Sequence, residues 1–432
     1  MKRFLIWGIG GLLLLALAAI GILAFLNADD LSGQHVPASA TLNPAEQITR
    51  GAYLVRAGDC MACHTARGGQ SYAGGRAIQT PFGAIYSPNL TSDHATGIGS
   101  WSADDFWRAM HNGKSKDGSL LYPAFPYPNY TKVTRADADA MFAYLHSLPP
   151  VSQKNRAPEL RFPYNNRLLL YGWRALYFRP GVYQAASEQS VEWNRGAYLV
   201  QGLGHCSACH STRNALGGTE LKAELGGGFI PVLNWYAPSL TSDQEIGLGD
   251  WEIGHISALL KTGISARGTV LGPMAEVVGA SLQHLNDGDI TAMAVYLKTL
   301  PRPSASADKP KEHASLPEID RVLTQGAKLY ETHCADCHQA SGKGVPPAYP
   351  ALVNNHAITM PSAVNAIRIV LNGGFPPGTA GNPRPYGMPP FGPVLSDSEA
   401  AAVVSYMRNA WGNQATLVTP MEVNRYRAVP LD

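Results

Sequence analysis

The sequence predicts an all-α protein of three tandem domains that follow an N-terminal transmembrane helix. Three observations support this prediction: a motif of the form Cys-x-x-Cys-His occurs three times, two of the regions around it repeat each other, and each region ends in a segment of helical periodicity. A chain of 432 residues is also too long for a single hydrophobic core. Length therefore agrees with a division into several domains.

The repeated motif occupies residues 60–64, 206–210 and 334–338, and its copies use all 6 cysteines of the chain. On one helical turn the two cysteines and the histidine lie along the same face. This spacing is the attachment signature of c-type haem, in which two thiols bond the vinyl groups and the imidazole reaches the iron. We therefore expect three covalent haems. Their expected ligands are Cys60, Cys63 and His64, then Cys206, Cys209 and His210, and finally Cys334, Cys337 and His338.

Other uses of cysteine fit this pattern less well. A structural zinc ion needs four ligands, and no copy has a second Cys-x-x-Cys or a histidine pair nearby. A redox dithiol of the thioredoxin type does not require a histidine after its second cysteine. Three complete copies with no cysteine left over favour haem attachment.

The N-terminus has the composition of a membrane anchor. Lys2 and Arg3 precede residues 4–26, an uncharged and mostly apolar run of 23 residues. About 20 residues span a bilayer, and basic residues before such a run favour a cytoplasmic N-terminus, so the rest of the chain would be exported. We expect an uncleaved anchor. The alternative is a cleaved signal sequence, after which the exported chain would attach to the membrane peripherally.

Internal repetition sets the domain boundaries. Residues 50–55, Arg-Gly-Ala-Tyr-Leu-Val, return letter for letter as residues 195–200, and residues 87–93 return with two substitutions as 237–243. The first two units are therefore duplicates. The expected organisation is an anchor or signal sequence (1–27), a polar tether (27–43), domain 1 (45–150), an aromatic and basic connector (151–190), domain 2 (191–301), a flexible linker (302–318), domain 3 (319–412) and a C-terminal tail (413–432).

Each unit is expected to begin and end with a helix. The first helix carries a tyrosine and runs into the motif. The last helices are expected at residues 136–148, 287–300 and 397–411, where apolar residues recur at helical spacing. The expected N-caps are Asp287 and either Ser396 or Asp397, and Pro149 and Pro301 are expected to end the first two of these helices.

With these motifs in place, the chain resembles the three-haem cytochrome c subunits of bacterial membrane-bound dehydrogenases, which serve gluconate, fructose, alcohol and aldehyde dehydrogenases. The likeness runs from about residue 45 to 412 and includes Gly-Pro-Met-Ala-Glu-Val at 272–277 and Tyr-Gly-Met-Pro-Pro-Phe at 386–391. The resemblance implies three class I cytochrome c domains on the periplasmic side of the bacterial inner membrane. It also implies an electron-transfer subunit, whose partner is a catalytic subunit with a flavin, pyrroloquinoline quinone (PQQ) or molybdenum cofactor, and which passes electrons towards ubiquinone or a terminal oxidase.

Two methionines are expected to bind iron opposite the motif histidines, because a soft thioether favours ferrous iron and raises the potential. Met388 follows His338 by 50 residues and stands in a Gly-Met-Pro-Pro loop, where a core methionine is unusual. Met274 lies in the corresponding loop of the second unit, and its competitor Met293 lies inside the last helix. The expected metal ligands are thus His64, His210, His338, Met274 and Met388.

The first unit departs from the family at this position. Its loop at 121–128 carries Phe125 where relatives commonly have methionine. Three arrangements stay open: an empty or water-filled sixth position, a substitute ligand such as His111 or Met110, or a phenylalanine packed over the iron. We favour the first or the third, because the two substitutes belong to the end of a preceding helix.

Two connecting features have alternative interpretations. Residues 164–178 are aromatic and basic, with no acidic residue, and are expected to form a packing helix rather than an interfacial one. Pro81, Pro231 and either Pro346 or Pro347 are expected to shape the loops whose carbonyls orient the haem histidines, although simple turn formation explains them equally well.

Composition excludes several functions. The 34 basic and 32 acidic residues nearly cancel, so nothing indicates nucleic-acid binding. The glycine clusters lack the strand-then-helix setting of a phosphate loop, and nothing resembles a flavin or molybdenum site. We therefore expect no catalytic residue here and substrate oxidation on another polypeptide. The alternatives are a haem enzyme that uses an open position on the first haem and an oxidase-linked electron carrier.

Overall fold

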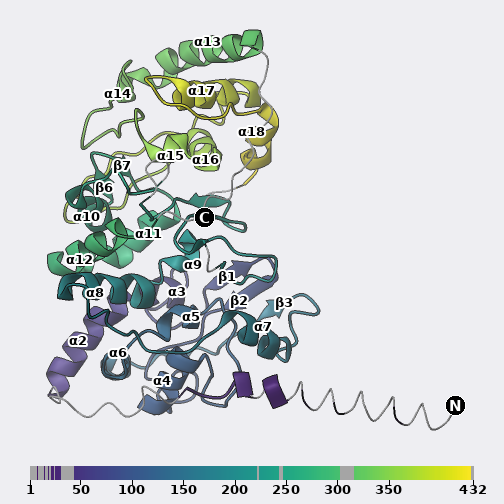
Figure 1. Cartoon of the computed structure of the whole chain (residues 1–432), viewed down its shortest axis with the longest axis vertical. Coiled ribbons are helices and arrows are strands. Elements are labelled where there is room, and N and C mark those ends of the chain that lie inside the picture. The colour runs from purple at the N-terminus through teal and green to yellow at the C-terminus, as the bar shows by residue number, and fades with distance from the viewer. Residues whose placement is uncertain are drawn as a thin grey trace. The chain divides into compact units, whose positions relative to one another are not determined.

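This computed structural model describes residues 43–220, 223–242, 247–301 and 316–429, together with residues 7, 14, 18, 21–23 and 25–30 nearer the N-terminus (Figure 1). The chain divides into two compact units. The first comprises Met1–Val55, Cys63–Gln184 and Asn214–Gly218, and the second comprises Arg56–Ala62, Ala185–Arg213 and Thr219–Asp432.

Helices dominate both units, as predicted. The helices of the first half are α2 (Pro44–Ala57), α3 (Cys60–His64), α4 (Ala103–Asn112), α5 (Tyr127–Tyr130), α6 (Arg135–Ser147) and α7 (Leu169–Tyr177). They are followed by α8 (Val191–Tyr198), which continues as a π-helical turn over Leu199–Leu203, and by α9 (Ser207–His210), α10 (Ile253–Thr262), α11 (Pro273–Ala280) and α12 (Asp287–Lys298). The last group is α13 (Leu316–His333), α14 (Ala335–His338), α15 (His356–Thr359), α16 (Val364–Asn372), α17 (Asp397–Asn409) and α18 (Pro420–Arg427).

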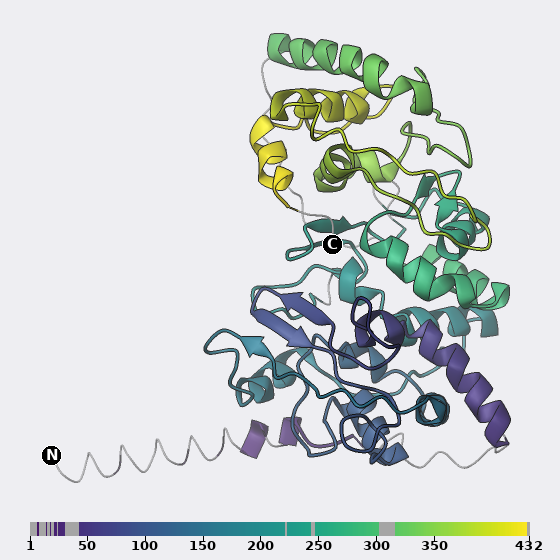
Figure 2. The ribbon, with the colours of Figure 1, turned by 180° about the vertical axis from the view of Figure 1, so that it is seen from behind.

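The same close helix crossing occurs three times. Gly51 of α2 lies against Ala140 of α6, so closely that a Cβ on the glycine would collide with the alanine carbonyl. Gly196 of α8 and Ala292 of α12 form the second crossing, and Gly326 of α13 and Ala402 of α17 form the third. In each case a tyrosine four residues after the alanine also contacts the glycine, and these tyrosines are Tyr144, Tyr296 and Tyr406. We call these the first, second and third helix pairs. Figures 1 and 2 both show α13 and α17 of the third pair side by side.

An ion pair accompanies the first two crossings. Arg50, which precedes the crossing glycine, pairs with Asp137 of α6 at 2.5 Å. Arg195 pairs with Asp289 of α12 through two hydrogen bonds of 2.7 Å. Both carboxylates are buried, so each guanidinium compensates the charge of a carboxylate taken out of water. This shared ion pair supports the prediction that the first two regions are duplicates.

The helix ends agree with most sequence signals. Ser396 caps α17 and forms a capping box with Glu399, as predicted. The prediction of Asp287 as the cap of α12 was wrong, because Asn286 has the extended backbone and accepts the hydrogen bond from the Asp289 amide. Asp287 instead lies in the first turn, where the positive end of the helix dipole stabilises its negative charge.

Three small antiparallel sheets were not predicted. The first contains β1 (Ala77–Thr80), β2 (Gly83–Tyr86) and β3 (Glu159–Leu160), with Ala77 opposite Tyr86. The second pairs β4 (Gly228–Ile230) with β5 (Trp235–Ala237), and the third pairs β6 (Ile264–Ser265) with β7 (Gly268–Thr269). β2 ends just before the repeated segment that begins at residue 87, and β5 ends at residue 237, where the second copy begins. Each hairpin therefore fixes the position at which its segment starts.

Several predictions concern residues outside the described part of the chain. These are most of the predicted transmembrane run, residues 31–42 of the predicted tether, residues 302–315 of the predicted linker and the last three residues of the tail. Among the residues that are described, no helix is long and apolar enough to cross a membrane.

The beginning of the predicted tether is docked rather than free. Asn27 is buried and accepts a hydrogen bond of 2.8 Å from Arg174 Nε. Asp30 binds the ring of His111 at 3.0 Å, and its amide donates to Asn112. The tether prediction was therefore wrong for residues 27–30, because their polar side chains have partners more than 80 residues away in the sequence.

The crossing at Gly326 gives a stability prediction. A valine at this position would force a side chain into the backbone of α17, so Gly326→Val should lower the free energy of unfolding by about 1–3 kcal/mol, measured by chemical denaturation. The control is Gly254→Ala in α10, where an added Cβ would meet nothing within 4 Å and stability should be equal or slightly higher. Equal stability of the valine variant and the unmodified chain would contradict a close crossing.

Candidate haem-binding sites

Each motif histidine is oriented by a proline carbonyl. The Nδ1 atom of His64 lies 2.7 Å from the Pro88 oxygen, that of His210 lies 2.7 Å from the Pro238 oxygen, and that of His338 lies 3.0 Å from the Pro350 oxygen. A carbonyl only accepts, so Nδ1 carries the proton in all three rings. The unprotonated Nε2 then faces away from the carbonyl, and this is the tautomer that binds iron.

The orienting prolines are not the predicted ones. We expected Pro81, Pro231 and Pro346 or Pro347, but the carbonyls belong to Pro88, Pro238 and Pro350. The sequence contained a signal for the first two, because Pro88 and Pro238 occupy the same position in the repeated segments 87–93 and 237–243.

The electrostatics of the histidines suit metal binding. Burial lowers the pKa of His64, His210 and His338, while the hydrogen bond to the proline carbonyl opposes this shift. Because the pKa values lie below the usual value for histidine, the imidazoles are neutral at pH 7. A neutral imidazole has the lone pair that iron requires.

Burial keeps several of the motif thiols protonated. It raises the pKa of Cys206 to about 12 and that of Cys334 to about 11, and it also raises the pKa of Cys209. These groups are therefore protonated thiols at neutral pH. No group of three or more His, Cys, Asp or Glu side chains that could hold a metal ion occurs within the described residues.

No disulfide joins any of the 6 cysteines, and the helical turns α3, α9 and α14 carry most of each motif. Cys63 and Cys209 are exposed as residues and the other four are half-buried. The predicted set of two thiols and one oriented imidazole is therefore brought together at all three motifs. These donors fit a covalent haem.

Exposure separates the two expected methionine ligands from their competitors. Met274, in the first turn of α11, and Met388 are half-buried. Met293 in α12, by contrast, is 1% exposed, and Met141 and Met110 are also fully buried in helices. A methionine that binds iron needs its sulfur on the wall of the haem site rather than inside a helical core.

Backbone pairing holds the loop that carries Met388. Its amide donates to the Gly374 oxygen at 2.8 Å, and its carbonyl accepts from the Gly374 amide at 3.0 Å. A Cβ on Gly373 would collide with this same carbonyl, and Gly373 also has a positive φ of 69°. The loop is thus fixed by a backbone ladder that only glycine permits at position 373.

The first motif has no corresponding methionine. Phe125 is half-buried, and its ring centroid lies 5.2 Å from that of Tyr130. His111 is fully buried, with its Nδ1 3.0 Å from the Thr131 oxygen and its Nε2 3.0 Å from the Asp30 carboxylate. Because both ring nitrogens are engaged, His111 is not available as a substitute ligand.

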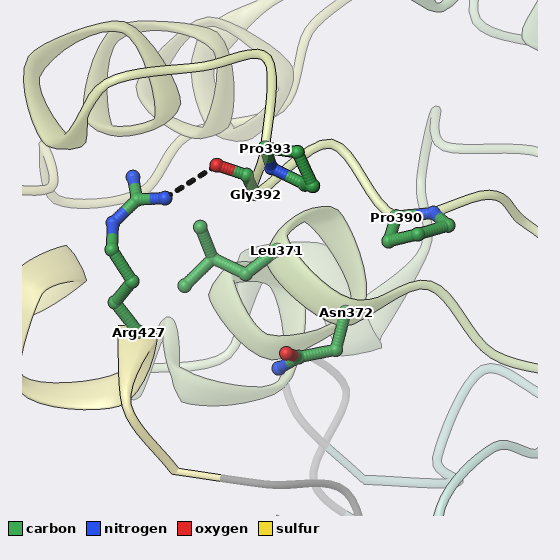
Figure 3. A pocket seen from close by; sticks show the side chains of 6 residues that line it. All are labelled: Leu371, Asn372, Pro390, Gly392, Pro393 and Arg427. Carbon is green, nitrogen blue, oxygen red and sulfur yellow. Dashed lines mark hydrogen bonds between the residues drawn. The ribbon is translucent and has the colours of Figure 1, made fainter.

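A pocket of about 420 Å³ borders the Gly-Met-Pro-Pro loop at Pro390, and no motif residue lines it. Figure 3 shows its lining residues, which are Leu371, Asn372, Pro390, Gly392, Pro393 and Arg427. None of them is a cysteine or histidine. Arg427 donates to the carbonyls of Gly392 and Leu395 and pairs with Asp397, so it holds α18 in place.

Two features together define a c-type cytochrome. An oriented histidine follows two thiols on a helical turn, and this motif comes after a helix that crosses its partner at a glycine. In agreement, the family model described as Cytochrome c matches residues 48–149 and 323–411.

Longer similarities identify the branch of this class. The chain is 40% identical to the "Gluconate 2-dehydrogenase cytochrome c subunit" of Pantoea cypripedii, over 88% of this chain and 89% of the relative. It is 40% identical to the "Alcohol dehydrogenase (quinone), cytochrome c subunit" of Gluconobacter oxydans, over 85% and 79%. It is 36% identical to the "Fructose dehydrogenase cytochrome subunit" of Gluconobacter japonicus, over 96% and 88%. The chain therefore belongs to the family of cytochrome c subunits of dehydrogenases, as the resemblance indicated.

Proposed function

We propose that this chain is the electron-transfer subunit of a dehydrogenase complex and carries three covalent c-type haems in three tandem cytochrome c domains. The observation that carries the proposal is the hydrogen bond from the motif histidine to a proline carbonyl, which recurs at all three motifs. The three glycine crossings support the same division, with domains at residues 45–150, 191–301 and 319–412.

The partner in this proposal is the catalytic subunit of a dehydrogenase that acts on an alcohol, an aldehyde or a sugar acid. The relatives are named as cytochrome subunits of gluconate, alcohol and fructose dehydrogenases, which supports this class of partner. The cofactor of the partner would be a flavin, PQQ or a molybdenum centre. Electrons would pass through this chain towards ubiquinone or a terminal oxidase.

The chain's own residues hold each carrier in place and adjust its potential. When bound, each haem supplies a one-electron redox centre. His64, His210 and His338 would bind one face, and the proline carbonyl on each Nδ1 makes the imidazole more basic. Met274 and Met388 would bind the opposite face of the second and third haems, where a thioether favours the ferrous state.

We also propose that the chain is anchored by its N-terminal apolar run on the periplasmic side of the inner membrane. The buried position of Asn27 supports an uncleaved segment, because cleavage after residue 27, the end of the predicted anchor or signal sequence, would remove a residue that binds Arg174. The hydrogen bond from Asp30 to His111 extends this docking beyond the apolar run.

The function is tested by purifying the chain in mild detergent from its native membrane. We expect a larger subunit with a redox cofactor to co-purify and to reduce this chain when its substrate is added. Mass spectrometry of the denatured chain should find three haem additions and no free thiol. Two additions, bound zinc, or substrate turnover by the isolated chain would contradict the proposal.

The methionine ligands are tested by substitution. Met274→Ala and Met388→Ala should each remove the weak near-infrared sulfur-to-iron band of one haem and lower its potential, because the soft ligand is lost. The matched controls are Met293→Leu and Met407→Leu, since both residues are fully buried in the last helix of the same helix pairs. Those variants should keep both bands. An unchanged spectrum after either alanine substitution would exclude that methionine as a ligand.

The first haem is expected to differ from the other two. With Phe125 in the ligand loop and His111 engaged, it should be partly high-spin and should bind carbon monoxide. Phe125→Met should convert it to a low-spin haem of higher potential, measured by electron paramagnetic resonance and redox titration. Phe142→Met, in α6, is the control and should change neither property. Three low-spin haems and no carbon monoxide adduct in the unmodified protein would contradict this expectation.

A further inference from the structure

The helix α7 has a buried face and an apolar exposed face. Leu170, Arg174 and Phe178 are spaced by four residues and are buried. On the other side, Leu168 is 71% exposed and Leu176 is 66% exposed, with Leu169 half exposed between them. A Cβ added at Gly172 on this helix would meet nothing within 4 Å. The expected packing helix is therefore present, but three of its leucines are exposed to solvent.

A basic rim surrounds this apolar face. Residues 160–187 contain no acidic residue, and Arg161, Arg167 and Arg179 are all exposed. Each arginine donates to a backbone carbonyl, which fixes its position: Arg161 to Pro81, Arg167 to Leu120, and Arg179 to Ala175 and Phe178. An apolar face with a positive rim matches the interface between lipid tails and anionic headgroups.

The end of the N-terminal apolar run is fixed beside the same helix. The side-chain amide of Asn27 donates to the Tyr171 carbonyl at 3.1 Å, and Arg174 Nε donates to the Asn27 amide oxygen at 2.8 Å. Lys114 donates to the Asn27 carbonyl at 2.7 Å and pairs with Asp29. Figures 1 and 2 both show the short helical turn before Asn27 next to α7.

The described residues of that run also expose apolar side chains. Phe25 is 80% exposed, and the others with large exposed fractions are Trp7, Leu14, Ile22 and Leu26. Two apolar surfaces therefore meet at Asn27, one on the N-terminal run and one on α7. Removal of apolar side chains from water lowers the free energy of the system, so large exposed apolar surfaces usually mark binding sites.

We propose that the exposed face of α7 lies in the surface of a lipid bilayer, so that the first unit contacts the membrane through this helix as well as through the anchor. Phe162, which precedes Leu168 by six residues, is also 86% exposed. The inference rests on the proposed anchoring, because the apolar run would hold α7 at the membrane. A bilayer is favoured over a protein partner because the three exposed arginines and the apolar face adjoin an apolar run of membrane-spanning length.

The test uses the full chain with its haems in vesicles of phosphatidylcholine and phosphatidylglycerol that contain a photoactivatable, carbene-forming phosphatidylcholine. After illumination, labelled peptides are identified by mass spectrometry. We expect label on residues 162–179 and on residues 4–26. Residues 43–50 at the exposed start of α2, which both views place on the side away from α7, serve as the background.

Variants then test the face itself. The triple substitution Leu168→Ser, Leu169→Ser and Leu176→Ser should reduce the label on residues 162–179 to the background of α2 and leave the label on residues 4–26 unchanged. The matched control is Val191→Ser, Val394→Ser and Met421→Ser, three exposed apolar residues of the second unit, which should change neither label. Haem absorption spectra verify that both variants fold.

The outcomes separate this inference from the anchoring proposal. Label on residues 4–26 without label on residues 162–179 would overturn the role of α7 and leave the anchor intact. No label on either segment would overturn both. A label on residues 162–179 that persists in the leucine variant, or that disappears when the catalytic subunit is bound, would also overturn the inference, because the face would then not contact lipid in the complex.

Discussion

The close crossing of two helices at a glycine is the constraint on which each Cys-x-x-Cys-His motif depends. In all three helix pairs the first helix runs from this crossing into the Cys-x-x-Cys-His motif, so the crossing sets where the motif begins. The contact is between backbones, and it cannot be relieved by a side-chain rotation. The third pair has Gln325 where the others have an arginine before the glycine, and it therefore lacks the accompanying ion pair at this position. The glycine, and not the ion pair, is the shared requirement.

The sequence predicted the parts of the sites that depend on local spacing. The cysteines and histidines of each motif lie within five residues, so one helical turn brings them together whatever the rest of the chain does. The ends of α6 and α17 were likewise predicted from local signals, namely Pro149 and Ser396. The short strands were missed because runs of two to four residues show too little alternation to be recognised.

The errors arose where distant residues meet. The orienting carbonyls come from prolines 12 to 28 residues beyond the histidines, and only the shared position of Pro88 and Pro238 in the repeated segments marks two of them in the sequence. Residues 27–30 have a polar composition that is typical of a tether, yet their partners are Arg174, His111 and Asn112. Composition describes what a segment resembles in isolation, whereas docking depends on the groups that the folded chain presents to it.

Within the second unit, the two loops that carry the expected methionine ligands pack against each other. Leu271, three residues before Met274, contacts Gly374, whose backbone pairs with Met388. Trp235 lies against Gly272, and the guanidinium of Arg368 lies over the Trp235 ring, 4.9 Å from its centroid. Asn365 binds both backbone groups of Tyr236, which fixes α16 to β5. Electron transfer between two centres becomes slower as their separation grows. Rigid contact between the two ligand loops would keep the separation of the two centres short and constant. The hydrogen bonds of Asn365 and the contacts of Leu271 and Trp235 with the loop glycines provide that rigidity.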